Sequence, residues 1–234
     1  MHSPPQIPTA PTVLSAHAGI ALRRFAALAA MLGWAALGTQ LWLTMGIVLG
    51  QGRGMVMGLV VYFGFFTVLT NILAALVLSA CAVGPGFVGY RRLSNAVTRT
   101  TTAGAIVIVG LVYFLILRHL WHPSGAQFWA DAALHYLMPM LTVMFWALVV
   151  PSGAISWRHA PWLAVYPLAY LVYVFVRGSI TSLYPYDFID LNTLGLGQAL
   201  VNSAGVMFAY ALVIGLLLAL KAGHAALRQR RHIH

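Results

Sequence analysis

The stretch MVMGLVVYFGFFTVLTNILAALVLSACA, residues 55–82, contains no charged residue. A membrane-spanning α-helix needs roughly 20 apolar residues, so this stretch is long enough to cross a bilayer. Five further apolar runs lie before and after it, separated by Gly/Pro-rich or basic gaps. The sequence therefore predicts an all-α fold, a polytopic membrane bundle of six transmembrane helices. The predicted spans cover residues 22–49, 55–82, 102–120, 131–150, 162–177 and 199–221.

The composition excludes an ordinary soluble domain. Charged residues make up 7% of the 234 residues and hydrophobic residues 61%, whereas a soluble domain carries roughly 25% charged residues. The net charge of +10 does not indicate a nucleic-acid partner, because the basic residues are scattered and form no stripe beside aromatic side chains. We expect them to contact anionic lipid headgroups at the cytoplasmic face. The single cysteine, Cys81, excludes an internal disulfide.

The basic residues alternate between the two sides of the predicted bundle. One side holds Arg23, Arg24, Arg91, Arg92, Arg99, Arg158, Lys221, Arg228, Arg230 and Arg231, and the other holds Arg53, Arg118 and Arg177. The positive-inside rule places the richer side, and with it both termini, in the cytoplasm. All three acidic residues, Asp131, Asp187 and Asp190, fall on the opposite side.

The chain divides into three predicted parts. Residues 1–19 contain four prolines and are expected to form a disordered cytoplasmic leader. Residues 20–222 form the six-helix transmembrane domain. Residues 223–234 form a basic cytoplasmic tail.

Polar residues of the second span share one helical face. Thr67 and Thr70 are three residues apart, and Thr67 and Asn71 are four apart, so all three side chains project from the same side of a helix. Polar groups at membrane depth are costly and are therefore candidates for function. The alternative is that they hydrogen-bond a neighbouring helix and hold the bundle together.

The fourth span opens with DAALHYLMP, in which Asp131 and His135 are four residues apart. A carboxylate that holds one ring nitrogen of a histidine leaves the other free to accept a proton. If that nitrogen meets Thr67 or Thr70, the group supplies a nucleophile, a base and an orienting acid, with Asn71 or backbone amides for the oxyanion. The alternative is a packed histidine beside an acid at a helix start.

Thr67 and His135 can pair only if they lie at similar depths in the membrane. Thr67 lies about 18 Å along its helix from residue 55 at 1.5 Å per residue. His135 lies close to the predicted start of its span and is expected nearer the surface. Helix tilt or a different starting residue for the fourth span would close this difference in depth.

Other polar residues and two prolines suggest further features. His119 and His122 leave the membrane beside Arg118, but no second histidine pair exists on another span. We therefore expect no metal and no other cofactor, and assign these residues to interfacial anchoring. Pro139 and Pro167 lie inside spans and are predicted to kink them.

The loop after the fifth span carries a candidate clamp. Arg177 ends that span, and Tyr184, Asp187 and Asp190 follow it in YPYDFID. Guanidinium groups pair well with carboxylates, so one interpretation is an Arg–carboxylate clamp that holds the loop over the bundle. The other is that the same residues form the mouth or lid of a substrate site.

Three motifs together resemble the bacterial branch of the androgen-induced protein family. They are FFTVLTNIL at 65–73, DAALHYLMPML at 131–141 and WLAVYPLAYLVYVFVRGSITSLYPYDFIDLNTLG at 162–195. The resemblance implies a small six-span protein, here of the bacterial inner (cytoplasmic) membrane. The animal members are similar to threonine hydrolases that cleave fatty-acid esters of hydroxy fatty acids with an intramembrane threonine and a histidine.

Carried over residue by residue, the resemblance implies a nucleophile at Thr67 or Thr70 and a base at His135. Thr67 is favoured because it follows the aromatic pair. The animal proteins resemble this chain less at Asp131, where an amide-type residue stands, so its orienting role is not inherited. The leading hypothesis is a membrane lipid ester hydrolase acting on a fatty-acyl ester. The alternative is a non-catalytic transporter, lipid-binding or scaffold protein.

Overall fold

The computed structural model describes residues 13–120 and 122–231, and this part of the chain is helical without a strand. Six of its helices are long and apolar enough to cross a membrane, which confirms the predicted all-α polytopic bundle. The elements are α1 (Val13–Gly50), α2 (Met55–Gly64), α3 (Phe66–Val83), α4 (Tyr90–Leu93), α5 (Ala96–Leu115), η1 (Leu117–His119), α6 (Gly125–Ala132), η2 (Ala133–Leu137), α7 (Met138–Val149), η3 (Trp157–His159), α8 (Ala160–Thr181), η4 (Asp187–Ile189) and α9 (Leu191–Arg231).

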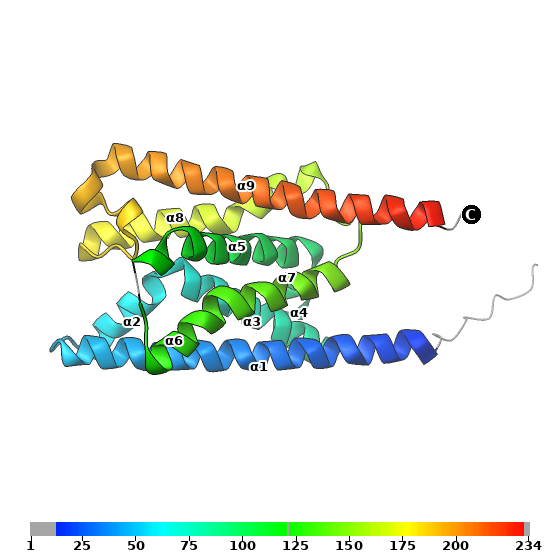
Figure 1. Cartoon of the computed structure of the whole chain (residues 1–234), viewed down its shortest axis with the longest axis horizontal. Coiled ribbons are helices and arrows are strands. Elements are labelled where there is room, and N and C mark those ends of the chain that lie inside the picture. Colours follow the sequence, from blue (N-terminus) through cyan, green and yellow to red (C-terminus); the bar gives the residue numbers. More distant parts are fainter. Residues whose placement is uncertain (1–12, 121, 232–234) are drawn as a thin grey trace, which may run out of the picture.

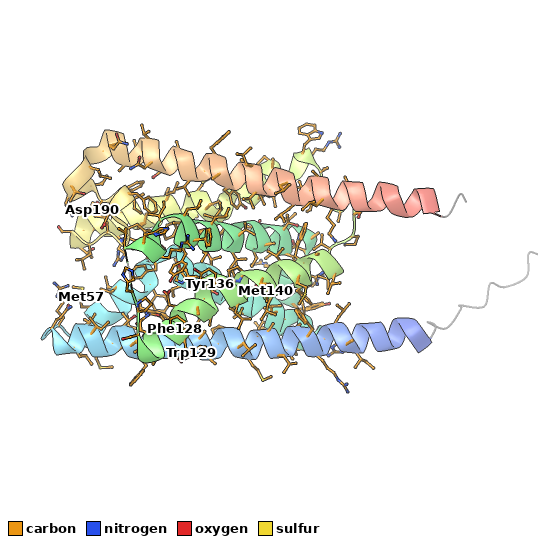
Figure 2. The ribbon with its side chains drawn as sticks, viewed as in Figure 1. Met57, Phe128, Trp129, Tyr136, Met140 and Asp190 are labelled. Carbon is orange, nitrogen blue, oxygen red and sulfur yellow. The ribbon has the colours of Figure 1, made fainter. Side chains whose placement is uncertain are left out.

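The helices run side by side, with α1 and α9 along opposite sides of the bundle (Figure 1). The start of α1 and the end of α9 lie at the same end, as six crossings require. Large apolar side chains cover the outer surface, among them Phe128, Trp129, Tyr136 and Met140 of the fourth span (Figure 2). Such a surface suits a hydrocarbon surrounding rather than water.

Several of the predicted boundaries are wrong. The third and sixth spans begin at Ala96 and Leu191 rather than at 102 and 199. Helix α1 begins at Val13, so the predicted disorder of residues 1–19 does not hold for its last seven residues. The last proline of the leader is Pro11, so no proline interrupts a helix after it; residues 1–12 lie outside the described part of the chain. The fourth span begins at Gly125 rather than at 131. The predicted tail continues α9 as a helix to Arg231, and residues 232–234 lie outside the described part.

The second predicted span is broken at Phe65, whose backbone is extended (φ −79°, ψ 130°) between α2 and α3. The break frees carbonyl groups at the end of α2, which must find donors inside an apolar bundle. Helix α8 supplies them: the Tyr170 hydroxyl donates to the Gly64 carbonyl at 3.1 Å, and the Tyr173 hydroxyl donates to the Phe63 carbonyl at 3.2 Å. The distant helix α8 therefore stabilises the break.

The fourth span contains a π-helical turn, η2, directly before Pro139. Proline has no N–H for the carbonyl four residues earlier, that of His135, and its ring crowds that group in a regular α-helix. The wider π turn accommodates the proline without ending the span. Helix α5 approaches this turn closely at Gly110, where a Cβ would lie 3.2 Å from the His135 carbonyl oxygen. Pro167, by contrast, does not interrupt α8.

Candidate functional site

The two irregular segments meet, and they bring Thr67 and His135 together. Thr67 is the second residue of α3, directly after the break, and His135 lies in the π turn. The Thr67 Oγ1 atom lies 3.3 Å from His135 Nε2. Since the fourth span begins at Gly125, His135 lies about 15 Å along it, which matches the depth of about 18 Å counted for Thr67. The earlier start of the fourth span thus removes the difference in depth that the sequence suggested.

The surroundings of His135 determine its tautomer. The Nδ1 atom lies 2.9 Å from the backbone carbonyl of Asp131 and 3.2 Å from its carboxylate Oδ1. A carbonyl only accepts hydrogen bonds, so Nδ1 carries the hydrogen and Nε2 is left as an acceptor. The ring of Tyr113 stacks on the imidazole, with 4.1 Å between ring centroids and 20° between planes. Imidazole Nε2 is therefore held ready to accept the Thr67 hydroxyl proton.

Thr70, the other candidate nucleophile, faces elsewhere. It is fully buried, and its hydroxyl lies 2.9 Å from the Tyr166 hydroxyl of α8. It lines neither of the two cavities described below. Of the two threonines, only Thr67 therefore lies beside His135.

Asn71 links the two irregular segments. Its Nδ2 group donates to the Thr67 carbonyl at 2.9 Å and to the Leu134 carbonyl at 3.2 Å. The side chain is fully buried and lines neither cavity. The suggested oxyanion role for Asn71 is therefore not supported by its geometry; Asn71 positions α3 against η2.

Tyr186, which the sequence analysis did not single out, contacts the candidate nucleophile directly. Its hydroxyl accepts a hydrogen bond from the Thr67 backbone N–H at 3.3 Å and lies 3.5 Å from Thr67 Oγ1. The first N–H groups of a helix lack intrahelical acceptors and carry partial positive charge, which explains this contact at the start of α3. Burial raises the pKa of Tyr186, although its hydrogen bonds with Thr67 oppose the shift, so the phenol stays protonated and remains a donor.

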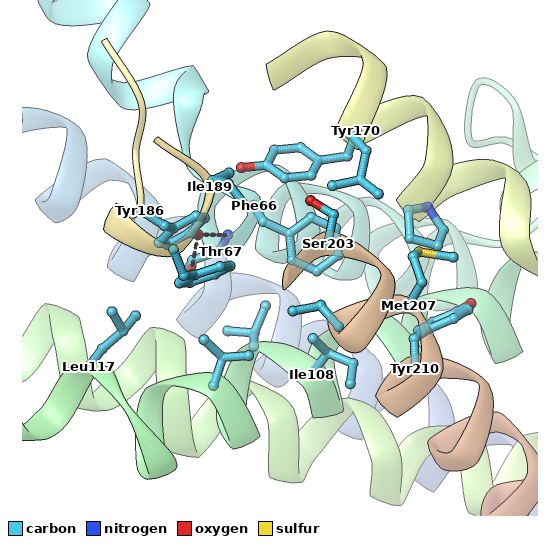
Figure 3. A pocket seen from close by; sticks show the side chains of 16 residues that line it. Phe66, Thr67, Ile108, Leu117, Tyr170, Tyr186, Ile189, Ser203, Met207 and Tyr210 are labelled. Carbon is cyan, nitrogen blue, oxygen red and sulfur yellow. Dashed lines mark hydrogen bonds between the residues drawn. The ribbon is translucent and has the colours of Figure 1, made fainter. Parts of the chain in front are cut away.

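Two cavities meet at Thr67 and Tyr186, which line both. The wide cavity, of about 420 Å³, lies among α1, α2, α3, α5, α6 and the loop at 185–187, and Asp131 and His135 line it. The narrow cavity, of about 60 Å³, lies among α3, α5, α8 and α9. Figure 3 shows the narrow cavity with Thr67 and Tyr186 at one end and Met207 and Tyr210 at the other.

Polar side chains from two helices line the wide cavity. The Gln127 amide of α6 donates to Gln40 of α1 at 2.9 Å, and the Gln40 amide donates to Thr44 at 3.3 Å. Gln40, in the middle of the first span, is a polar residue at membrane depth and is therefore the sequence signal of this cavity.

Arg177 forms a clamp, but not the predicted Arg–carboxylate clamp. Its guanidinium donates to the Val60 carbonyl from Nη2 at 2.8 Å and to the Leu183 carbonyl from Nη1 at 2.9 Å. It lies against Gly64, where a Cβ would be 2.7 Å from Arg177 Cζ. The Val60 carbonyl lies in the last turns of α2, just before the break in the second span, and the Leu183 carbonyl lies in the loop after α8. The residue therefore joins α2 to the loop that carries Tyr186.

The other members of the predicted clamp have separate positions. Asp187 lines the wide cavity. Asp190 accepts a hydrogen bond from the Asn192 N–H at the start of α9. The Tyr184 ring packs so closely on α8 that it fills the space a side chain at Gly178 would need. Among these residues only Asp187 belongs to the mouth of a cavity.

Replacing Arg177 with lysine should lower the stability of the protein. Lysine presents one ammonium group instead of a planar fork and does not reach the Val60 and Leu183 carbonyls together. A buried carbonyl that loses its donor costs about 1–3 kcal/mol. We expect a lower unfolding temperature for Arg177→Lys in detergent, with Arg53→Lys in an exposed loop as the control. Equal unfolding temperatures for the two variants would contradict the clamp.

The histidines after the third span show no metal-binding arrangement. Arg118 donates to the His119 ring at 3.2 Å, and His122 is exposed. Across the described residues, no group of three or more His, Cys, Asp or Glu side chains is placed to hold a metal ion.

Comparisons of the chain with family models, with curated proteins and with solved structures found no match. The candidate site is therefore defined by the geometry of Thr67, His135 and Tyr186.

Proposed function

We propose that this protein is an integral-membrane ester hydrolase with Thr67 as nucleophile and His135 as general base. The observation that carries the proposal is the contact between Thr67 Oγ1 and the acceptor nitrogen Nε2 of His135, on the wall of a cavity inside the bundle. A hydroxyl is a weak nucleophile unless a base takes its proton, and this pairing supplies that base.

The reaction follows from the positions of these groups. The Thr67 hydroxyl attacks the ester carbonyl carbon while its proton passes to His135 Nε2. The tetrahedral intermediate collapses, the bond to the alcohol oxygen breaks, and His135 returns the proton to that oxygen. The acyl group is then bound to Thr67 through an ester. Water attacks this ester with His135 as base, which releases the acid and restores the threonine.

The negative charge on the carbonyl oxygen needs donors at the start of α3. The backbone N–H of Thr67 points out of the first turn of the helix, and the Tyr186 hydroxyl lies beside it. In the substrate complex these two groups donate to the oxyanion, and the helix dipole favours the charge. The π turn and the break in the second span therefore have a common use, since each exposes backbone beside the reacting atoms.

The substrate class follows from the surroundings. The site lies in the membrane-spanning part of the bundle, and apolar side chains dominate the narrow cavity and form half of the lining of the wide one. Such a site suits an acyl ester that partitions into the bilayer. The resemblance to the androgen-induced protein family supports the same class, fatty-acid esters of hydroxy fatty acids or similar lipids, and a bacterial inner membrane as the location.

A fluorophosphonate probe tests the proposal. An activated hydroxyl displaces fluoride from phosphorus and keeps the phosphonyl group, so peptide mass spectrometry identifies the modified residue. We expect the adduct on Thr67, no adduct on Thr70, and no labelling of heat-unfolded protein. Purified protein should also hydrolyse lipid esters. Absence of both labelling and turnover would refute the hydrolase, and a co-purified lipid would then favour a lipid-binding protein.

Replacing Tyr186 with phenylalanine should lower kcat roughly 100-fold while KM changes little, as expected for the loss of one oxyanion donor. The substitution removes one oxygen atom and keeps the ring that packs against Phe65 and Phe188. Tyr184→Phe is the matched control, because Tyr184 lies two residues away and lines neither cavity. If both variants keep the activity of the unmodified protein, Tyr186 has no catalytic role.

A further inference from the structure

Thr67 stands at the boundary between two cavities that differ in size and polarity. His135 and Asp131 line only the wide one, whereas the narrow one is bounded by Val109 of α5 and by Val206 and Met207 of α9. An ester also has two unequal arms, the acyl chain and the alcohol. If Thr67 is the nucleophile, as proposed above, the reacting carbonyl lies at this boundary and each arm enters one cavity.

The position of His135 decides which arm enters which cavity. The histidine that removes the Thr67 proton must return it to the leaving alcohol oxygen, so that oxygen lies on the histidine side. Because His135 faces only the wide cavity, the alcohol occupies the wide cavity. The acyl chain, on the other side of the carbonyl, then occupies the narrow cavity.

The narrow cavity limits the acyl chain. Its volume is about 60 Å³. The wide cavity, at about 420 Å³, holds a much larger alcohol. Size therefore favours an ester with a short acyl chain on a long-chain alcohol.

The charges in the wide cavity limit the alcohol. Two carboxylates line it, those of Asp131 and Asp187, and among the described residues no lysine or arginine does. A substrate carboxylate would meet like charges where water is scarce, which is unfavourable. The amide of Gln127 and the hydroxyl of Thr44 suit uncharged hydroxyl or ester oxygens instead.

We infer that the site selects esters of a short acyl chain with a large uncharged lipid alcohol. The inference depends on the proposed hydrolase, and it departs from the carboxylate-bearing alcohol that the family resemblance implies.

A set of esters of one alcohol tests both the preferred length of the acyl chain and the preference for an uncharged alcohol. Methyl 12-hydroxyoctadecanoate is acylated with butanoyl, hexanoyl, decanoyl or hexadecanoyl chains, and the hexanoyl ester is also prepared with the free carboxylate. At pH 8, in detergent micelles, we expect kcat/KM to be at least tenfold higher for the hexanoyl than for the hexadecanoyl ester. The methyl ester should likewise exceed the free carboxylate at least tenfold.

Substitutions in α9 test whether the acyl chain occupies the narrow cavity. Val206→Phe fills the narrow cavity and should lower hexanoyl hydrolysis at least tenfold while butanoyl hydrolysis is reduced less. Val201→Phe, the same change on the outer surface of α9, is the control and should have no effect. Met207→Ala enlarges the cavity and should shift the preference toward decanoyl, which tests the assignment even if Val206→Phe does not fold.

The outcomes separate the two proposals. Hydrolysis with a preference for hexadecanoyl chains, or for the free carboxylate, overturns the cavity assignment and leaves the hydrolase intact. An unchanged chain preference in Met207→Ala also overturns it. No hydrolysis of any ester, together with no probe on Thr67, overturns the hydrolase and this inference with it.

Discussion

Thr67→Ala should reduce kcat/KM for a lipid ester about 1,000-fold or more, because loss of a nucleophile that acts with a base removes most of the catalysis. The residual rate would come from binding and from the oxyanion donors. Thr67→Ser keeps the hydroxyl and should retain much of the activity. The measurement is steady-state hydrolysis by purified protein in detergent, with unfolding temperatures recorded for each variant.

Thr70→Ala is the matched control for this prediction. Thr70 lies one turn further along α3 and contacts Tyr166 rather than His135, so its loss should reduce stability more than activity. Equal activity of Thr67→Ala and the unmodified protein would rule out Thr67 as nucleophile. A large loss in Thr70→Ala alone would require α3 to be rotated relative to the arrangement described.

His135→Ala should lower kcat by about 100- to 10,000-fold, the usual range for loss of a general base. Labelling of Thr67 by the fluorophosphonate should fall in parallel, since the hydroxyl loses its proton acceptor. The double variant Thr67→Ala/His135→Ala should be no slower than Thr67→Ala alone, because residues that act as one unit are not additive.

Additive losses in that double variant would mean that Thr67 and His135 act independently. His159→Ala is the control for the histidine substitution. His159 lies outside both cavities, and its Nδ1 accepts a hydrogen bond from the Ser156 N–H at the start of η3, so its loss should leave hydrolysis unchanged.

Hydropathy and charge were sufficient to predict the six-span bundle, because apolar length and basic loops are local properties of the sequence. The start of the fourth span was harder to predict from the sequence. Gln127 and Asp131 lower the hydropathy of its first turns, yet both side chains face a cavity inside the bundle rather than lipid. Polar residues at an internal cavity therefore look like a loop when the sequence is considered alone.

The candidate site was only partly predictable. The four-residue spacing of Asp131 and His135 indicated a common helical face, and the polar face of the second span indicated threonines. The choice between Thr67 and Thr70 depends on the break at Phe65. No proline near Phe65 indicates this break in the sequence. Its cause is a set of donors on α8, more than a hundred residues later in the chain. Tyr186 was missed because YPY contains two tyrosines, and only the path of the loop decides which one turns inward.

The interrupted second span has a consequence for biosynthesis. While the chain is being inserted, the partners of the Phe63 and Gly64 carbonyls, Tyr173 and Tyr170, have not yet been synthesised, because they belong to the fifth span. Until α8 arrives, a continuous helix is the better arrangement for this segment, since it satisfies its own backbone. We therefore expect the contact between Thr67 and His135, and any reaction that depends on it, to form only when translation of the fifth span is complete.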